Sequence, residues 1–381
     1  MIPNRFKTSF SEDIFRAKYS QGPSDTWDAL ADRLVSDVCG DRGGAESRLM
    51  SETDLKDLAQ AIKEFKFVPG GRYLYYAGRG AKFYNNCYLL RAEEDTREEW
   101  SNVTWRAMSC LMTGGGIGID YSQLREAGRQ LVRTGGQASG PLPLMYSINE
   151  IGRNVMQGGS RRSAIYASLN WQHGDISQFL KSKNWDDQIW TGRKSNGWMK
   201  QRNFNFPAPL DMTNISVNYD DASFGPPSEW PNEEEGNALS KNPIFLENCR
   251  QAMMTGEPGF SFNFGDKENE TLRNACTEVT SEDDSDVCNL GSINLGNIAN
   301  IEEFRSIVSL ASRFLVCGTL RAELPYDKVY KVREKNRRLG LGLMGIHEWL
   351  LQRNAKYEVT SELHEWLKVY KDESERSANE H

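Results

Sequence analysis

The sequence predicts an α/β fold, and two observations support it. Segments with helical periodicity alternate along most of the chain with short runs of β-favouring residues, as where the helical pattern of 100–112 gives way to the apolar run after it. The 381 residues are 38% hydrophobic and include ten tryptophans, which is enough to bury a substantial core. We therefore expect either one large α/β domain with attachments or two domains.

The first element predicted is a small helical lead-in. Residues 24–64 carry helical periodicity, and Ser24 and Ser51 stand where N-caps are expected, the second with Asp54 three residues later. The stretch "VPGGRYLYYAG" at 68–78 breaks this periodicity with Pro-Gly-Gly. Because aromatic and β-favouring residues follow, we interpret it as the entry into a sheet.

The middle of the chain alternates regularly. A helix over 100–112 is expected to end at the glycines of 114–116, with "IGIDYSQLR" as the strand that follows. A second helix is predicted over 140–157, because its first residues include prolines and Gly158-Gly159 lie just after it. Residues 220–243, rich in Pro, Gly and acid, predict a surface excursion. Helical segments are then expected over 301–320 and 326–354, before a polar end.

Charge and cysteine usage exclude several function classes. A formal charge of -7 argues against a protein that mainly coats nucleic acid. No run approaches the roughly 20 apolar residues of a membrane span, and the first residues lack a signal-peptide core, so the cytoplasm is the expected compartment. The seven cysteines are scattered with no C-x-x-C pair, unlike a secreted disulfide framework, a zinc ribbon or a thioredoxin-like motif.

Two glycine-rich stretches are candidates for nucleotide binding. "MTGGGIGID" at 112–120 fits neither a dinucleotide fingerprint nor a P-loop, and a helix C-cap leading into a buried strand accounts for it better. "QGGSRRSA" at 157–164 could present backbone N–H groups with Arg161 and Arg162 to a phosphate. A helix C-cap followed by a solvated arginine pair explains it equally well.

The segment "NACTE" combines three reactive groups. If it is extended, Asn274, Cys276 and Glu278 lie on one face, because side chains alternate along a strand. A carboxylate beside a thiol disfavours the thiolate, so the trio suits hydrogen-atom chemistry better than a cysteine nucleophile. The alternative is an ordinary buried cysteine in an edge strand.

Taken together, six stretches resemble the catalytic subunit of a ribonucleotide reductase, especially the cobalamin-dependent class II type and phage-like forms. The resemblance spans roughly residues 70–350. The six stretches follow one another in the same order as their counterparts in that family. The stretches are "NNCYLL" (85–90), "MTGGGIGIDYSQLR" (112–125), "QGGSRRSA" (157–164), "NACTEV" (274–279), "VCNLGSINL" (287–295) and "NRRLGLGLMG" (336–345).

The resemblance implies a ten-stranded α/β barrel built from two half-barrels, with a central finger loop near 270–287. It divides the chain into an N-terminal helical region, 1–69, and a partial barrel, 70–381, that lacks the C-terminal strands. "NACTE" is then expected at the finger-loop tip. "SEDDSD" (281–286) is expected to be a solvated turn, and "VCNLGSINL" a barrel strand.

The resemblance also implies the residue roles. Cys276 becomes the thiyl radical that removes the 3′ hydrogen of the ribose, Glu278 acts as general base on the 3′ hydroxyl, and Asn274 holds the sugar hydroxyls. Cys87 and Cys288 form the reducing pair that ends as a disulfide, which requires α-carbons within about 7 Å. Asn86, Cys87, Asn274 and Glu278 are the implied substrate contacts.

The implied effector site takes a deoxynucleotide. Its residues are Arg125 from the first specificity loop, in the 114–125 stretch, and five from the second: Gly158, Gly159, Ser160, Arg161 and Arg162. No metal ligand is assigned in this chain.

The expected cofactor is adenosylcobalamin, with a separate metal-containing subunit as the alternative radical source. Partners implied are a ribonucleotide di- or triphosphate, a thioredoxin- or glutaredoxin-type reductant and a complementary C-terminal half, because half a barrel leaves sheet edges exposed. No ATP-cone activity domain is expected, nor any nucleic-acid or membrane partner. A phage-encoded chain would work in the host cytoplasm.

Two alternatives to a reductase remain. One is a catalytically silent, effector-binding or truncated fragment of such an enzyme. The other is an α/β protein with structural cysteines.

Overall fold

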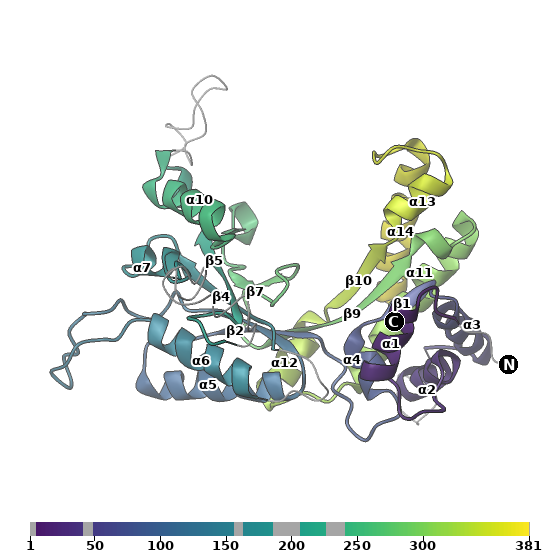
Figure 1. Ribbon diagram of the computed structural model, residues 1–381, viewed down its shortest axis with the longest axis horizontal. Helices are drawn as coiled ribbons and strands as arrows, with labels where there is room; N and C mark the ends of the chain where they lie inside the picture. The colour runs from purple at the N-terminus through teal and green to yellow at the C-terminus, as the bar shows by residue number, and fades with distance from the viewer. Residues whose placement is uncertain (1–4, 41–48, 156–162, 186–205, 226–240, 381) are drawn as a thin grey trace, which may run out of the picture. The chain divides into compact units, whose positions relative to one another are not determined.

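The computed structural model of the chain describes residues 5–40, 49–155, 163–185, 206–225 and 241–380 (Figure 1). The chain forms two compact units, one of residues 1–86 with 287–381 and one of residues 87–286. The division predicted from sequence, at residue 69, stays a prediction. None of the helices in the described ranges combines the length and apolar composition needed to cross a bilayer.

The unit of residues 87–286 is built on a curled sheet of five parallel strands in sequential order. The strands are β2 (Cys87–Arg91), β3 (Gly116–Asp120), β4 (Ile165–Asn170), β5 (Thr213–Tyr219) and β6 (Gly259–Phe262). The helices α5 (Arg97–Met112), α6 (Leu142–Asn154), α7 (Ile176–Leu180) and α10 (Pro243–Thr255) connect successive strands. Figure 1 shows α5 and α6 side by side on one face of this sheet. The predicted α/β class and half-barrel arrangement are confirmed.

The two helices predicted in this unit begin as their sequences indicate. Thr96 caps α5, since its side-chain oxygen accepts a hydrogen bond from the backbone N–H of Glu99. Pro141 stands at the start of α6, where a missing N–H costs nothing. Both predictions are confirmed, although α6 ends at Asn154 rather than at 157.

The acidic stretch "SEDDSD" is not the solvated turn predicted from its composition. Asp284, Ser285 and Asp286 are all buried. The guanidinium of Arg106, on α5, pairs with the carboxylates of Asp284 and Glu99. A backbone N–H from Arg91 also donates to Asp284, at 2.7 Å. The turn can be buried because a cation from another part of the chain neutralises it, which composition alone cannot reveal.

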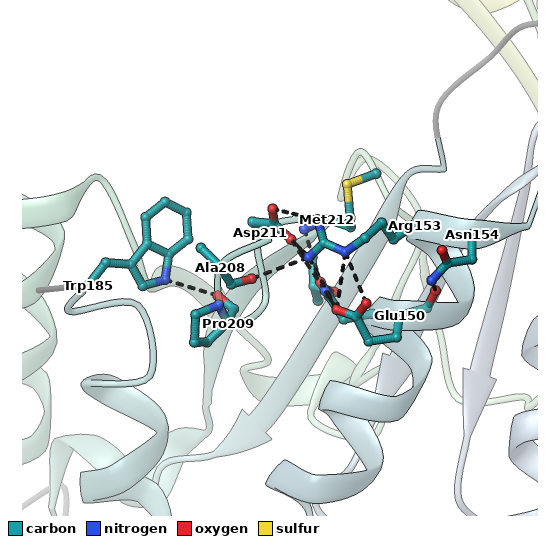
Figure 2. A network of polar contacts seen from close by, with 10 residues as sticks. Glu150, Arg153, Asn154, Trp185, Ala208, Pro209, Asp211 and Met212 are labelled. Carbon is teal, nitrogen blue, oxygen red and sulfur yellow. Dashed lines mark hydrogen bonds and ion pairs between the residues drawn. The ribbon is translucent and has the colours of Figure 1, made fainter. Parts of the chain in front are cut away.

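The C-terminal end of α6 is fixed to the segment before β5 (Figure 2). Arg153 pairs with Glu150 and Asp211, and one of its nitrogens donates to the Asp211 carboxylate at 3.0 Å. The backbone N–H of Met212 donates to the side chain of Asn149, on the same helix, at 2.9 Å. Ion pairs and hydrogen bonds therefore hold the C-terminal end of α6, just before residue 155.

The other unit packs helices around three strands. Strand β9 (Asp286–Asn294) pairs antiparallel with β1 (Phe67–Pro69) and parallel with β10 (Leu339–Met344). The lead-in contributes α1 (Ser9–Lys18), α2 (Trp27–Cys39), α3 (Glu52–Lys63) and α4 (Gly71–Tyr76); residues beyond β9 contribute α11 (Ile301–Arg321), α12 (Asp327–Asn336), α13 (Ile346–Gln352) and α14 (Ser361–Glu380). Helices α11 and α14 pack together, with the rings of Phe304 and Trp366 stacked 4.9 Å apart.

In this unit the predicted helical lead-in, the capping box at Ser51, the helix after residue 300 and the strand "VCNLGSINL" are confirmed. The cap predicted at Ser24 is wrong, because Thr26 accepts the N–H of Ala29 and α2 begins at Trp27. The polar C-terminal stretch is helical, as α14.

Two further predictions in this unit are wrong. The aromatic run after Pro69 forms the helix α4 rather than a strand, since its tyrosines pack into the core on a helical face. Residues 326–354 are not one helix, because β10 divides them. Gly340 allows that strand to lie beside β9, where an added Cβ would stand 2.3 Å from a side-chain carbon of Leu290.

Candidate active site

The candidate site begins where Cys87 opens strand β2. Its register partner on the neighbouring strand is Gly116, the first residue of β3. Cys87 is buried, at 4% exposure. The first of the predicted site cysteines is therefore fixed by the sheet itself.

The predicted finger loop is a short hairpin in the same unit. Strands β7 (Leu272–Arg273) and β8 (Thr280–Ser281) pair antiparallel and enclose residues 274–279. The segment "NACTE" is not extended, so the condition under which Asn274, Cys276 and Glu278 would alternate onto one face is not met. The backbone N–H of Thr277 donates to the carbonyl of Asn274 at 3.0 Å, and Thr277 has φ 68°. Cys276 stands on a turn, so its neighbours are placed by the turn rather than by strand alternation.

The hairpin runs along β3 in the opposite direction, in three contacts two residues apart. The Thr271 hydroxyl donates to Asp120 at 2.7 Å, at the end of β3. An added Cβ on Gly118 would stand 1.8 Å from the carbonyl oxygen of Arg273, and one on Gly116 would stand 2.9 Å from the Cβ of Ala275. Glycine is required because the two backbones approach so closely. This register carries the hairpin tip to the start of β3, at Gly116, beside Cys87.

The tip brings two thiols and a carboxylate together. The sulfur atoms of Cys87 and Cys276 and a carboxylate oxygen of Glu278 all lie within 4.8 Å of one another. Cys87 is buried, whereas Cys276 and Glu278 are exposed at the loop surface. The cluster can therefore meet a ligand from one side, with the sheet behind it. The alternative of a buried structural cysteine at 276 does not fit this exposure.

Asn274 supports the loop from within. It is fully buried, and its side-chain oxygen accepts the backbone N–H of Val279 at 3.1 Å. Its side-chain nitrogen is also buried and has no hydrogen-bond partner among the described residues. Since an unsatisfied buried donor is costly, this nitrogen is available to a ligand that reaches the site.

A residue missed by the sequence reasoning holds the base of the hairpin. The guanidinium of Arg273 donates to the carbonyl of Phe262, the last residue of β6, at 3.1 Å and to the side chain of Asn263, the next residue, at 2.8 Å. Burial lowers its pKa. Gly116 and Gly118 lie in the buried strand β3, which confirms the interpretation of this stretch as a helix C-cap leading into a buried strand. The first specificity loop that the resemblance implies for 114–118 stays a prediction. The spacing of two between these glycines in an apolar run was the available signal of close backbone approach.

Cys288 and Asn86 belong to the other unit. Cys288 is buried on β9, and its carbonyl accepts the backbone N–H of Asn86 at 3.1 Å. The side-chain oxygen of Asn86 is buried, with no hydrogen-bond partner in the described ranges. Because Cys87 and Cys288 fall in different units, their role as a redox pair stays a prediction.

Of the predicted effector residues, only Arg125 lies in the described chain; Gly158, Gly159, Ser160, Arg161 and Arg162 lie outside it. Arg125 pairs with the side chain of Asp95 and donates to its carbonyl at 2.9 Å. It lines a cavity of about 800 Å³ between the start of α5 and residues 131–140. That volume suits a ligand of nucleotide size.

Comparison with known proteins gives one family. Residues 85–206 and 240–366 match the family model described as the barrel domain of ribonucleotide reductase. A vitamin B12-dependent ribonucleoside-diphosphate reductase of Mycobacterium tuberculosis (strain CDC 1551 / Oshkosh) is 26% identical over 321 residues, which cover 79% of this chain and 43% of the relative.

Two more relatives agree. The enzyme of the same description from Thermoplasma acidophilum is 27% identical, covering 78% of this chain and 39% of the relative. A protein of Mycobacterium phage D29, named as a candidate adenosylcobalamin-dependent ribonucleoside-triphosphate reductase, is 22% identical, covering 91% and 65%. The chain thus spans less than two thirds of the length of each of these relatives.

Proposed function

The chain belongs to the ribonucleotide reductase family through its barrel domain, and from this premise we propose that it carries the radical cysteine for the reduction of ribonucleotides to deoxyribonucleotides. The substrate class is ribonucleoside di- or triphosphates. The observation that supports this most directly is the convergence of Cys87, Cys276 and Glu278 within 4.8 Å at the tip of one hairpin. The proposal extends to the whole reaction only together with the part of the relatives that this chain does not span.

The proposed chemistry assigns one task to each group. Cys276, as a thiyl radical, takes the hydrogen atom from C3′, forming an S–H bond as the C–H bond breaks. Glu278 accepts the proton of the 3′ hydroxyl, for which it must lie within hydrogen-bond reach. The 2′ hydroxyl departs as water with a proton from one of the two thiols, Cys87 and Cys288. The two electrons and the second proton of this pair form the new C2′–H bond, and the pair becomes a disulfide. Glu278 then returns its proton to the 3′ oxygen, and the hydrogen atom returns from Cys276 to C3′.

Substrate placement falls to the amides. The buried side-chain nitrogen of Asn274 is a donor suited to a sugar hydroxyl, since pairing it would remove the cost of leaving it unsatisfied. Asn86 is the second proposed contact, next to Cys87 in sequence. Fixing the ribose in this way accounts for much of the rate acceleration, because hydrogen transfer requires the reacting atoms to approach closely.

Radical formation at Cys276 requires an external source. Cys276 is exposed, so an external radical source can reach it. This exposure is compatible both with adenosylcobalamin and with a separate metal-containing subunit. The names of the relatives favour adenosylcobalamin. When bound, adenosylcobalamin would supply the radical chemistry that oxidises the Cys276 thiol. We assign no described residue to holding that cofactor.

The remaining partners follow from the same proposal. A thioredoxin- or glutaredoxin-type dithiol would re-reduce the Cys87–Cys288 disulfide, and a complementary C-terminal half would supply the part of the relatives that this chain does not span. We place the reaction in the cytoplasm, that of the host if the chain is phage-encoded. The division at residue 69 between a helical region and the partial barrel is part of this proposal.

A deoxynucleotide effector is proposed for the cavity beside Arg125. This site requires Arg125 to exchange its pairing with Asp95 for a phosphate, or to keep it while other groups bind the nucleotide. The glycines and arginines of 158–162 are proposed as the second part of the site.

The test replaces the radical cysteine. Cys276→Ser should abolish deoxynucleotide formation by the chain reconstituted with its complementary half and adenosylcobalamin, while circular dichroism and effector binding stay unchanged. Cys249→Ser, a half-buried thiol on α10 outside the cluster, is the matched control and should retain turnover. Turnover by Cys276→Ser above the background of the unreconstituted chain refutes the assignment.

The alternative of a silent effector-binding fragment is favoured by one observation, the cavity at Arg125, none of whose described lining residues belongs to the hairpin of β7 and β8. It predicts deoxynucleotide binding that Arg125→Ala weakens, and no turnover with any complementary chain. Turnover after reconstitution with a complementary chain would show that the chain is a reductase and not a silent fragment.

A further inference from the structure

We propose that Cys87, Cys276 and Glu278 also form a binding site for a thiophilic divalent cation such as Zn²⁺. Their two sulfur atoms and one carboxylate oxygen lie within 4.8 Å of one another. Within the described ranges this is the one group of three or more cysteine, histidine or acidic side chains with such spacing. The site would use three protein ligands and leave the fourth position to water or an external ligand, the arrangement of open zinc sites.

The distances allow such coordination after a small contraction. Zinc–sulfur bonds of about 2.3 Å in a tetrahedral site place two sulfur ligands about 3.8 Å apart. The two sulfur atoms, which lie within 4.8 Å, therefore have to approach each other by at most about 1 Å. Cys87 is fixed at the start of β2, so the movement falls to Cys276 and Glu278, which are exposed at the hairpin tip.

The donor set selects the metal class. Two thiolates favour Zn²⁺, Cd²⁺ or Co²⁺ over Mg²⁺ and Ca²⁺, which bind oxygen ligands. Binding exchanges the two thiol protons for the metal ion, so the site requires both cysteines reduced and releases protons to solvent. A disulfide that involves either cysteine prevents binding.

The consequence for catalysis rests on the proposed function. A bound ion holds Cys276 as a thiolate and occupies the Glu278 carboxylate, so neither the radical cysteine nor the base is available. The ion would therefore act as a reversible inhibitor that competes with substrate for the same groups. Chelation would restore activity.

The test reads metal binding directly, without nucleotide or partner. The reduced chain is titrated with Co²⁺, and sulfur-to-cobalt charge-transfer absorption is recorded. We expect one ion per chain, displaced by Zn²⁺, with the band abolished in Cys87→Ser and in Cys276→Ser. Glu278→Gln should weaken binding by about tenfold or more. Cys249→Ser should bind as the unmodified chain does.

Two results would overturn the proposal: no charge-transfer band in the unmodified chain, or a band of equal strength in Cys276→Ser. Because Cys276 is exposed, its serine variant keeps the test decisive even if the buried Cys87→Ser fails to fold. Failure here leaves nucleotide reduction untouched. Conversely, if the chain binds cobalt but forms no deoxynucleotide after reconstitution, only the proposed function is refuted.

Discussion

Replacement of Gly118 by alanine tests the contact that places the candidate site. The added methyl group would stand 1.8 Å from the carbonyl oxygen of Arg273, whereas real Cβ atoms essentially never come closer than 3.0 Å. The hairpin must therefore move away from β3 by at least 1.2 Å. The clashing atom belongs to the backbone, so a side-chain rotation cannot relieve the clash.

The expected cost has two parts. Overpacking of this kind destabilises by about 1–3 kcal/mol. A displacement of roughly 1 Å at the hairpin would reduce the reaction by about 100-fold, because hydrogen transfer depends on position. Gly116→Ala should be milder, since its Cβ would meet another methyl group at 2.9 Å. Gly136→Ala is the control: this exposed glycine in the same unit has open space around it.

Two assays follow the change without requiring turnover. Urea denaturation monitored by circular dichroism gives the free energy of unfolding, and a trivalent arsenical that bridges two nearby thiols reports the Cys87–Cys276 separation. Both should rank the variants Gly118→Ala, Gly116→Ala and Gly136→Ala, from most to least affected. If Gly118→Ala unfolds within about 0.5 kcal/mol of the unmodified chain and bridges as fast, the close approach is wrong.

Two more substitutions test the ion pairs. Arg106→Met should lower the free energy of unfolding in urea by about 3–5 kcal/mol, because the Asp284 carboxylate stays buried without its cation. Arg129→Met removes an exposed ion pair and should lower it by under about 1 kcal/mol. Equal losses in the two variants would contradict the burial argument. Hydrogen bonding to Arg313 lowers the pKa of Asp54 from 3.8 to about 2, so this pair stabilises the fold above pH 3.8 and the contribution is lost as pH falls through about 2. Asp54→Asn should then cost about 1–2 kcal/mol at pH 7, allowing for partial exposure, and the difference from the unmodified chain in thermal unfolding should shrink between pH 4 and pH 2; a constant difference would contradict it.

Local sequence signals predicted the elements whose boundaries are set locally. The capping box at Ser51 and the prolines at the start of α6 act within a few residues, and each was confirmed. The strand β9 was confirmed as well, but it was predicted from the family resemblance. The aromatic run of α4 was predicted as a sheet because propensity was weighed without its packing. The strand β10 was hidden in a helical pattern, since its glycines have meaning only beside β9.

The candidate site could likewise be predicted only as far as local sequence signals reach. Cys276 and Glu278 were identified as neighbours, but on the premise of an extended strand; the turn at Thr277 brings them together instead. The buried state of Asp284 depends on Arg106, which lies far away in sequence, so no local pattern could predict it. What the sequence offered was the types of the reacting groups, and what it lacked was the register of the hairpin on the sheet.

That register also explains why the thiols meet at an unusual place on the sheet. Open parallel sheets place ligands beyond the carboxyl ends of their strands, and a polar cavity of about 380 Å³ lies there, lined by Asp120, Asn170 and Asn218 among others. Cys87 lies at the opposite end, at the first residue of β2. The hairpin leaves the carboxyl end at Asp120 and runs back along β3, which is possible only because Gly118 admits its backbone. The site's position is therefore determined by the hairpin and its glycine contacts, more than by the sheet topology.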